Sequence, residues 1–296
     1  MHPDYLLGID GGGTRSRARL TDYSGTVLAE TTGGPANVWS DYTQAIQGTE
    51  QLIARTIAEA GLPADALART ALVAGLAGAN VASVQARLAS WQPACAAVQA
   101  ITDVEIACAG AHDGQPGAVL IVGTGSQGAA WNGERFTLLG GWGFALSDQG
   151  AGADLGRRTL RLALLAHEEI IAKTDLTHSV MARFHHSAES MLLWTRTATP
   201  GDWASVVPEV FGAADAGDPH AVALIQQTAD DITLLVRRLH RLSNGRIALM
   251  GGLASPVERW LPEAIRTLLV APRQDALAGA LYLARHNASL AETREI

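Results

Sequence analysis

Apolar and polar residues alternate along the first part of the chain in the pattern of short strands. The stretch Tyr5–Ile9 is mostly apolar, and Arg17–Thr21 alternates polar and apolar residues with a period of two. A period of two places successive side chains on opposite faces of a sheet. We therefore predict a strand, a glycine turn over residues 10–14 and a returning strand, followed by a turn at 23–25 and another strand in TVLAE.

The same order of elements recurs near the middle of the chain. A buried strand over Ala118–Val122 leads into the turn Gly123-Thr124-Gly125-Ser126, and a second strand follows. Asn132-Gly133 is a turn of the kind that hairpins prefer, and it leads into a third strand that ends near Gly141. Two hairpins with the same order of strand, glycine turn and strand predict two similar lobes that face each other across a cleft.

Helical periodicity fills most of the remaining chain. Residues 41–61 place Ala45, Leu52, Ile53 and Ile57 at helical spacing and end at Gly61. Three further segments are expected to be helical: 81–91, 152–169 and 218–242. Strands are expected at ALVAGL, at VQAI before Asp103 and at RIALM, with a closing helix at 275–287. Strands that alternate with helices indicate the α/β fold class.

Composition limits the possible functions. The 296 residues are enough for two domains, and a hydrophobic content of 48% supports a sizeable core. The net charge of -7 argues against a nucleic-acid or anionic-membrane surface. Cys95 and Cys108 form no disulfide framework or CxxC metal motif. No signal peptide or run of membrane-spanning length is visible, so we expect a cytoplasmic protein.

The first glycine run fits neither of two familiar phosphate loops. Gly11 and Gly13 supply two positions of a dinucleotide-binding GxGxxG motif, but Ser16 stands where the third glycine is needed. A Walker A loop needs Gly-Lys followed by Ser or Thr, and the single lysine is Lys173. A glycine hairpin can still direct backbone N–H groups at an anion, although a hairpin that binds nothing remains the alternative.

Several motifs together carry a family resemblance. They are GIDGGGTRSR, GPANVW, ITDVEIA, GTGS, GGWGFALSDQG, AADAGDP, MGGLASP and DALAGALYLARHN. In this order they resemble the N-acetylglucosamine and glucosamine kinases of the BadF/BadG-type ATPase family, within the actin-like sugar-kinase superfamily. The resemblance implies an α/β fold of two duplicated actin-like, ribonuclease-H-like lobes with a central cleft. It also implies ATP and Mg²⁺ in the cleft and phosphoryl transfer to the 6-hydroxyl of an amino sugar.

The resemblance also implies bounds for the lobes and a set of partners. The N-terminal lobe would span residues 1–115 and be completed by the C-terminal helix at about 277–296, and the second lobe would span 116–276. Small-molecule sugar and ATP are the expected partners, and the expected assembly is a homodimer.

The site residues that the resemblance implies fall into groups. One group lies at the ATP phosphates: Gly12, Gly13, Thr14 and Thr124. A second lies near the adenosine: Ala214, Gly251 and Gly252. A third binds the sugar: Asn37, Asp103, Ser126, Gln127, Gly141 and Asp148. Asp10 would hold Mg²⁺ through a water molecule.

Asp103 takes the general-base position of the family. It follows a buried strand and precedes a helix, so we expect it at the strand's carboxyl end facing the cleft. Its alternative role is the N-cap of a helix that starts at Val104, and Asp148 could equally be a turn and N-cap residue. Arg15 and Arg17 alternate on a strand and are expected at the surface rather than on phosphate.

The choice of amino sugar stays open at this point. Ser126 and Gln127 can donate to an acetyl carbonyl, which favours N-acetylglucosamine, whereas Asp148 can meet an ammonium group as well as a hydroxyl. Gln127 also stands where related kinases can carry Asn. Competing functions are a dehydratase activator with an iron–sulfur cluster, a non-catalytic sugar-binding regulator and an actin-like polymer. The two cysteines lack the setting that a bridging cluster needs.

Overall fold

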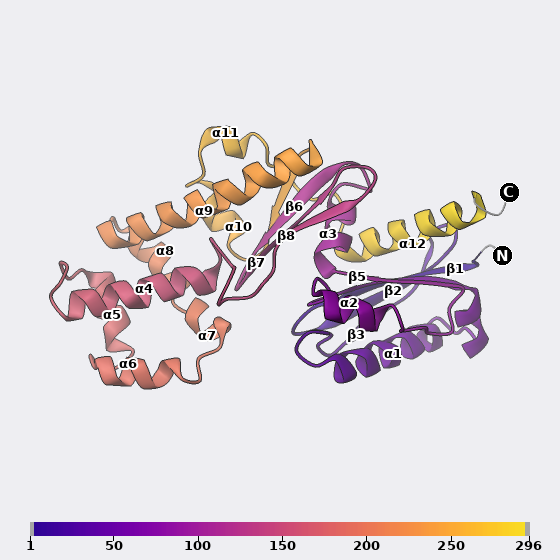
Figure 1. The fold of residues 1–296 in the computed structure, drawn as a ribbon, viewed down its shortest axis with the longest axis horizontal. Helices are drawn as coiled ribbons and strands as arrows, with labels where there is room; N and C mark the ends of the chain where they lie inside the picture. Colours follow the sequence, from indigo (N-terminus) through magenta and orange to yellow (C-terminus); the bar gives the residue numbers. More distant parts are fainter. Residues whose placement is uncertain (1–2, 294–296) are drawn as a thin grey trace.

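The computed structural model describes residues 3–293, in which two β-sheets and their helices form an elongated molecule (Figure 1). The strands of the first sheet are β1 (Tyr5–Gly11), β2 (Ser16–Asp22), β3 (Val27–Gly33), β4 (Thr70–Leu76) and β5 (Ala97–Ile101). The strands of the second are β6 (Gly117–Val122), β7 (Ser126–Trp131), β8 (Phe136–Gly140) and β9 (Ile247–Met250).

Most of the helices belong to the second half of the chain. The helices before residue 150 are α1 (Tyr42–Glu59), the 3₁₀ helix η1 (Ala64–Arg69), α2 (Ala82–Leu88) and α3 (Asp103–Ala111). Those after it are α4 (Gly152–His167), α5 (Asp175–Ala182), α6 (Ala188–Thr195), α7 (Pro200–Ala204), α8 (Val207–Asp215), α9 (Pro219–Ser243), α10 (Ala254–Glu258), α11 (Glu263–Arg266) and α12 (Ala276–Thr293). No helix within residues 3–293 is long and apolar enough to cross a membrane.

The two sheets repeat one topology. The strand order is β3-β2-β1-β4-β5 in the first sheet and β8-β7-β6-β9 in the second. In each sheet an antiparallel three-stranded meander is continued by a parallel strand. Leu269 adds an isolated parallel bridge at Ile247, where a fifth strand of the second sheet would lie. The α/β fold with two duplicated lobes is thereby confirmed.

The period of two in the first hairpin corresponds to burial. Ser16, Ala18 and Leu20 are buried on β2, whereas Arg17 and Arg19 are half-buried on its other face. This alternation fixes the register against β1, because a slip by one residue would expose the apolar row.

Parallel pairing brings several loops to one edge of each sheet. Gly11 at the end of β1 is paired with Leu76 at the end of β4, and Gly75 is paired with Ile101 of β5. In the second sheet Ile121 near the end of β6 is paired with Met250 of β9. Since ligands of such folds bind beyond the carboxyl ends of parallel strands, a site is expected at these two edges.

Helix α3 packs against both sheets. Its residues Val104 and Cys108 belong to a cluster with the second sheet, and Ile106 and Ala109 belong to a cluster with the first sheet and α12. The last helix, α12, lies beside the first strand, β1 (Figure 1). The lobe bounds at 115/116 and 276/277 stay a prediction.

Glycines allow α3 and α12 to cross at very short distance. A Cβ atom at Gly279 would lie 2.0 Å from the carbonyl oxygen of Ile106, and one at Gly110 would lie 2.1 Å from that of Asp275. These atoms belong to backbone, which cannot move aside as a side-chain end can. The crossing therefore tolerates no side chain at either position.

We expect Gly279→Ala to destabilise the protein by about 1–3 kcal/mol, the usual cost of overpacking, despite the better helix propensity of alanine. Gly48→Ala is the matched control, because Gly48 also lies inside a helix but has no heavy atom within 4 Å of a built Cβ. That change should stabilise by about 0.5–1 kcal/mol. Urea unfolding of both variants measures the difference, and equal stabilities would contradict the close crossing.

Candidate functional site

Asp103 is the first residue of α3, at the carboxyl end of β5. The N-cap is Thr102, whose side chain accepts from the N–H of Glu105 while the Glu105 carboxylate accepts from the N–H of Thr102. Because Thr102 and Glu105 form this capping box, the alternative prediction that Asp103 is the N-cap is wrong. The Asp103 carboxylate is not needed to cap the helix. The carboxylate accepts from the backbone: from the N–H of Val104 at 3.0 Å and from the N–H of Asp103 itself.

The carboxyl of Asp103 has an environment that disfavours its charge. Burial, followed by the negative charges of Asp10 and Glu105, raises its pKa to about 6, although backbone hydrogen bonds from Val104 and Asp103 act in the opposite direction. No cation of the described residues is among the groups that shift it. A carboxylate with such a pKa is half-protonated near pH 6 and is a better proton acceptor than an ordinary aspartate.

Asp10 is held by a cross-strand partner. Arg17 is paired with it in the β1–β2 register, and the Arg17 Nη2 atom donates to Asp10 Oδ2 at 2.7 Å. Arg17 is thus half-buried in an ion pair rather than fully exposed, and its guanidinium neutralises the candidate metal-binding carboxylate. Arg17 also lies 3.6 Å from Asp275, at the start of α12.

The two glycine turns carry unused N–H donors. In the first turn Gly12 donates to the Arg15 carbonyl at 3.0 Å, which leaves the N–H groups of Gly13 and Thr14 without an acceptor among the described residues. In the second turn the N–H groups of Thr124 and Gly125 likewise have no acceptor among residues 3–293. Adjacent free N–H groups at the end of a strand form a concave anion site.

The second turn is joined to the predicted adenosine residues. Gly251 follows β9 with a φ of +95°, and a Cβ there would lie 2.3 Å from the carbonyl oxygen of Val122 at the end of β6. Gly252 faces open space, with no atom within 4 Å of a built Cβ. Ala214 is on the buried face of α8, whose last residue, Asp215, forms an ion pair with Arg259 just beyond α10.

The predicted sugar residues of the second lobe come together at β7 and β8. Gln127 is paired with Gly140, and the Gly141 N–H donates to the Ser126 carbonyl at 3.2 Å. Asp148 accepts the N–H of Ser126 at 3.1 Å. The Nε2 atom of Gln127 is buried and has no partner in the described chain, so this group presents an unused donor.

Asp148 is buried in an unusual backbone conformation. Its φ of +67° is in the left-handed region, and only 7% of the residue is exposed. Burial raises the pKa of its carboxyl, the hydrogen bond from Ser126 lowers it, and the charge of Asp154 raises it. No cationic side chain compensates its charge among the described residues. A strained, buried and uncompensated carboxylate is typical of a binding site.

Asn37 lies in a turn beside the first glycine turn. Its Oδ1 atom accepts the N–H groups of Trp39 at 3.0 Å and Ser40 at 3.1 Å, which leaves the amide nitrogen as the free end. A cavity of about 250 Å³ adjoins Gly13 and Asn37. The structure thus places Asn37 near the predicted phosphate turn.

Sequence reasoning missed one residue that joins the lobes. Asn80, just after β4, donates from Nδ2 to the carbonyl oxygen of Gly141 at 2.9 Å. Two tryptophans in neighbouring loops are exposed, Trp142 by 59% and Trp39 by 63%. The small-residue turn AGAN was the available signal, but nothing in it indicates a partner so distant in sequence.

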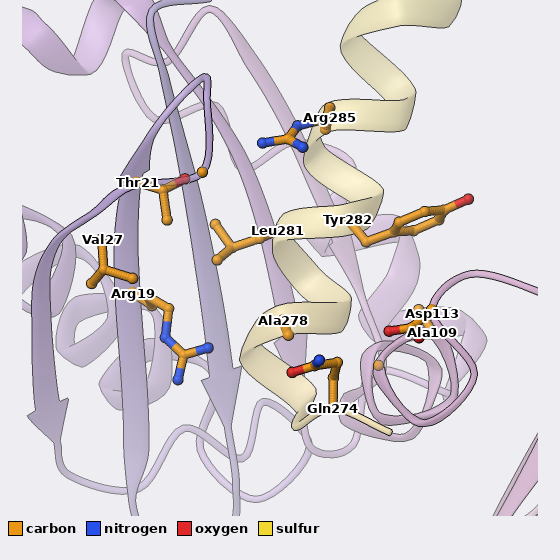
Figure 2. Close-up of a pocket in the computed structure, with 12 residues that line it drawn as sticks. Arg19, Thr21, Val27, Ala109, Asp113, Gln274, Ala278, Leu281, Tyr282 and Arg285 are labelled. Carbon is orange, nitrogen blue, oxygen red and sulfur yellow. The ribbon is translucent and has the colours of Figure 1, made fainter. Parts of the chain in front are cut away.

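Another pocket lies away from all of the predicted residues. It has a volume of about 330 Å³ and is bounded by Arg19 of β2, Val27 of β3, and Leu281 and Tyr282 of α12 (Figure 2). Its walls are largely apolar. None of the predicted site residues lines it, and it takes no part in the site at the strand ends.

The two cysteines are unsuited to an iron–sulfur cluster. Burial raises the thiol pKa to about 11 for Cys95 and to about 12 for Cys108, so the thiolate form is disfavoured at neutral pH. Cys108 packs between α3 and the second sheet. Within residues 3–293 no group of three or more His, Cys, Asp or Glu side chains is arranged to hold a metal ion.

Comparison with known proteins gives consistent results. A family model described as the BadF/BadG/BcrA/BcrD ATPase family matches residues 7–284. Glucosamine kinase GspK of Vibrio cholerae is 36% identical over 95% of this chain and 96% of its own. A crystal structure from Chromobacterium violaceum, provisionally named N-acetylglucosamine kinase, has 34% identity and a TM-score of 0.83, and the match covers 95% of this chain and 99% of that one. The ROK hexokinase of Thermus thermophilus shares the fold, with a TM-score of 0.56 and 18% identity over 99% of this chain and 100% of that one.

The raised pKa of Asp103 predicts a pH-dependent cost in stability. The folded state holds the proton more tightly than the unfolded chain, so stability falls as the pH rises from 3.8 to about 6 and is lowered by a constant amount above. We therefore expect Asp103→Asn to be more stable than the wild type at pH 8, by on the order of 1 kcal/mol, and equally stable below pH 4.

Denaturant unfolding at pH 4, 6 and 8 measures this difference. Asp202→Asn is the control of opposite sign, because hydrogen bonds from Thr199 lower the pKa of Asp202. A gap between Asp103→Asn and the wild type that does not change with pH would rule out a raised pKa at Asp103.

Proposed function

The chain belongs to the BadF/BadG/BcrA/BcrD ATPase family, and on that premise we propose that it is a kinase that transfers the γ-phosphate of ATP to the 6-hydroxyl of an amino sugar. The observation that carries the proposal is the carboxyl of Asp103: partly buried, without a cation, and at the strand edge beside Asp10 and the first glycine turn. A charged carboxylate in this environment lowers the stability of the folded protein, and a role in catalysis would explain why it is there.

Asp103 would act as the general base. A base that accepts the proton of the sugar hydroxyl works best when its pKa lies near the working pH, and about 6 meets that condition better than 3.8. Because Thr102 and Glu105 cap α3 by themselves, the Asp103 side chain can turn to the hydroxyl without loss of the helix end. Phosphoryl transfer needs mainly this orientation and the stabilisation of charge.

The two glycine turns would bind the ATP phosphates. The free N–H groups of Gly13 and Thr14 in one lobe and of Thr124 and Gly125 in the other supply donors from both sides. Gly123 has no atom within 4 Å of a built Cβ, so the space beside the second turn can admit a phosphate. Gly251, Gly252 and Ala214 would then lie on the adenosine side.

The donor set also fits Mg²⁺ bound together with ATP. A carboxylate oxygen of Asp10 is a ligand that Mg²⁺ accepts alongside water and phosphate oxygens, and Asp10 would bind through water because Arg17 occupies one of its oxygens. When bound, Mg²⁺ neutralises charge on the transferring phosphate. Since the described protein offers no larger ligand cluster, most of the coordination would come from ATP and water.

For the sugar we propose Asn37, Ser126, Gln127, Gly141 and Asp148 as contacts, with glucosamine preferred. Asp148 supports this preference, because its buried carboxylate lacks a cation that the ammonium group of glucosamine would supply. The 36% identity to a glucosamine kinase supports it as well. The Gln127 amide would donate to a sugar hydroxyl. The homodimer stays a prediction.

Assays of glucosamine, N-acetylglucosamine and glucose, each with ATP and Mg²⁺, test this function. We expect glucosamine to have a kcat/KM about tenfold or more above that of N-acetylglucosamine. With N-acetylglucosamine the buried Asp148 carboxylate has no ammonium partner, and the free-energy cost is at least that of one lost hydrogen bond. The phosphorus coupling in NMR spectra of the product identifies the 6-position. A preference for N-acetylglucosamine would reverse the choice of sugar, and activity on none of the three would remove the kinase proposal.

Asp103→Asn tests the base. The amide keeps the shape but accepts no proton, so we expect kcat to fall by roughly 100-fold or more while the affinity for ATP is retained. For the wild type, kcat/KM should fall about tenfold per pH unit below pH 6, where Asp103 becomes protonated, and the variant should lose this acidic limb. Near-normal turnover in the variant would exclude Asp103 as the base.

A further inference from the structure

One side chain crosses from the first lobe to the sugar residues of the second. Asn80 follows β4 of the five-stranded sheet, and Gly141 follows β8 of the four-stranded sheet. The Asn80 Nδ2 atom donates to the Gly141 carbonyl oxygen at 2.9 Å. Both residues lie in the loops at the strand ends that face each other, so this hydrogen bond spans the two lobes at the site.

The loop that carries Asn80 is fixed to the rest of its lobe. The Ala77 N–H donates to the Gly11 carbonyl at 2.8 Å, and the Ala77 carbonyl accepts the N–H of Val38 at 3.0 Å. Gly78 has a φ of +81°, and a Cβ there would lie 2.8 Å from the Oδ1 atom of Asn37. Asn80 therefore moves as one body with the first glycine turn and with the turn of Asn37.

Gly141 is tightly packed on its other side. It has a φ of +76°, and a Cβ there would lie 2.5 Å from the Cδ atom of Gln127 and 2.6 Å from its Nε2 atom. The backbone of Gly141 thus lies against the side-chain amide of Gln127, whose Nε2 atom is buried and has no hydrogen-bond partner in the described chain. A shift of the Gly141 peptide must change the room and the orientation of the Gln127 amide.

We propose that Asn80 is a positioning residue that couples closure of the lobes to the shape of the sugar site at Gln127. The proposal rests on the proposed function for its consequence in catalysis. When the lobes are closed, the Asn80 amide holds the Gly141 carbonyl, and the Gln127 amide is kept ready for the sugar. Without this bond, sugar binding must itself supply the closure, so the sugar affinity falls while the ATP turns are untouched.

Asn80→Asp is the sharpest variant, because it keeps the size and shape of the side chain but removes its donor and sets a carboxylate against a carbonyl oxygen. We expect the KM for the preferred amino sugar to rise about tenfold, as for the loss of one hydrogen bond, while kcat changes less than threefold and the KM for ATP is unchanged. Asn80→Ala removes the donor without adding charge and should change the KM for the sugar in the same direction.

Asn132→Asp is the matched control. Asn132 is exposed in the turn after β7, and its side chain only accepts, from the N–H groups of Glu134 and Arg135, so an aspartate can replace it. It should leave both KM values unchanged. A purely structural role of Asn80 would instead lower the melting temperature and reduce the amount of active enzyme, with no separation of sugar KM from ATP KM.

Small-angle scattering of the ligand-free proteins separates this proposal from the kinase proposal. We expect a larger radius of gyration for Asn80→Asp than for the wild type and for Asn132→Asp, whether or not an amino sugar is phosphorylated. A wild type that is inactive on amino sugars, together with this expansion, would overturn the kinase function and the catalytic consequence but support the interlobe bond. An active wild type and an Asn80→Asp variant with the same sugar KM and the same scattering would overturn the role of Asn80.

Discussion

Parallel pairing of β4 beside β1, and of β9 beside β6, is the constraint on which the site depends. Because paired parallel strands end at a common edge, the loops that follow them cannot be far apart. Gly11 is paired with Leu76 in the first sheet, and Ile121 with Met250 in the second. Two edges built in this way, one for each lobe, hold every group that we assign to ATP and sugar except Ala214.

Donors and carboxylates are separated within this site. Free backbone N–H groups gather at the two glycine turns, as in Gly13 and Thr124, whereas the uncompensated carboxylates are Asp103 and Asp148. The turns suit phosphate, and the carboxylates suit hydroxyl and ammonium groups. Burial of both acids without cations lowers the stability of the unliganded protein, and an ammonium-bearing substrate would offset part of that cost at Asp148.

Much of the fold was predictable because periodicity reports burial, as on β2, and because glycine turns mark where strands end. The helix α3 shows the limit: its sequence is apolar on nearly all sides, which indicates that it is buried but not that Val104 and Ile106 face different sheets. The partner of Asp10 depends on strand register, and the reach of Asn80 to Gly141 depends on how the lobes meet. Short sequence patterns carry neither kind of information.

The packing of α12 against β1 has a consequence for synthesis on the ribosome. The first sheet's cluster of Leu6 and Val73 is covered by Ala280 and Leu283, which are translated only after all strands and the other helices of the second lobe. The N-terminal lobe therefore emerges with one apolar face bare, while the second lobe can already fold behind it. A nascent chain that terminates before residue 276 would expose this face permanently, so premature termination should yield an insoluble product rather than half an enzyme.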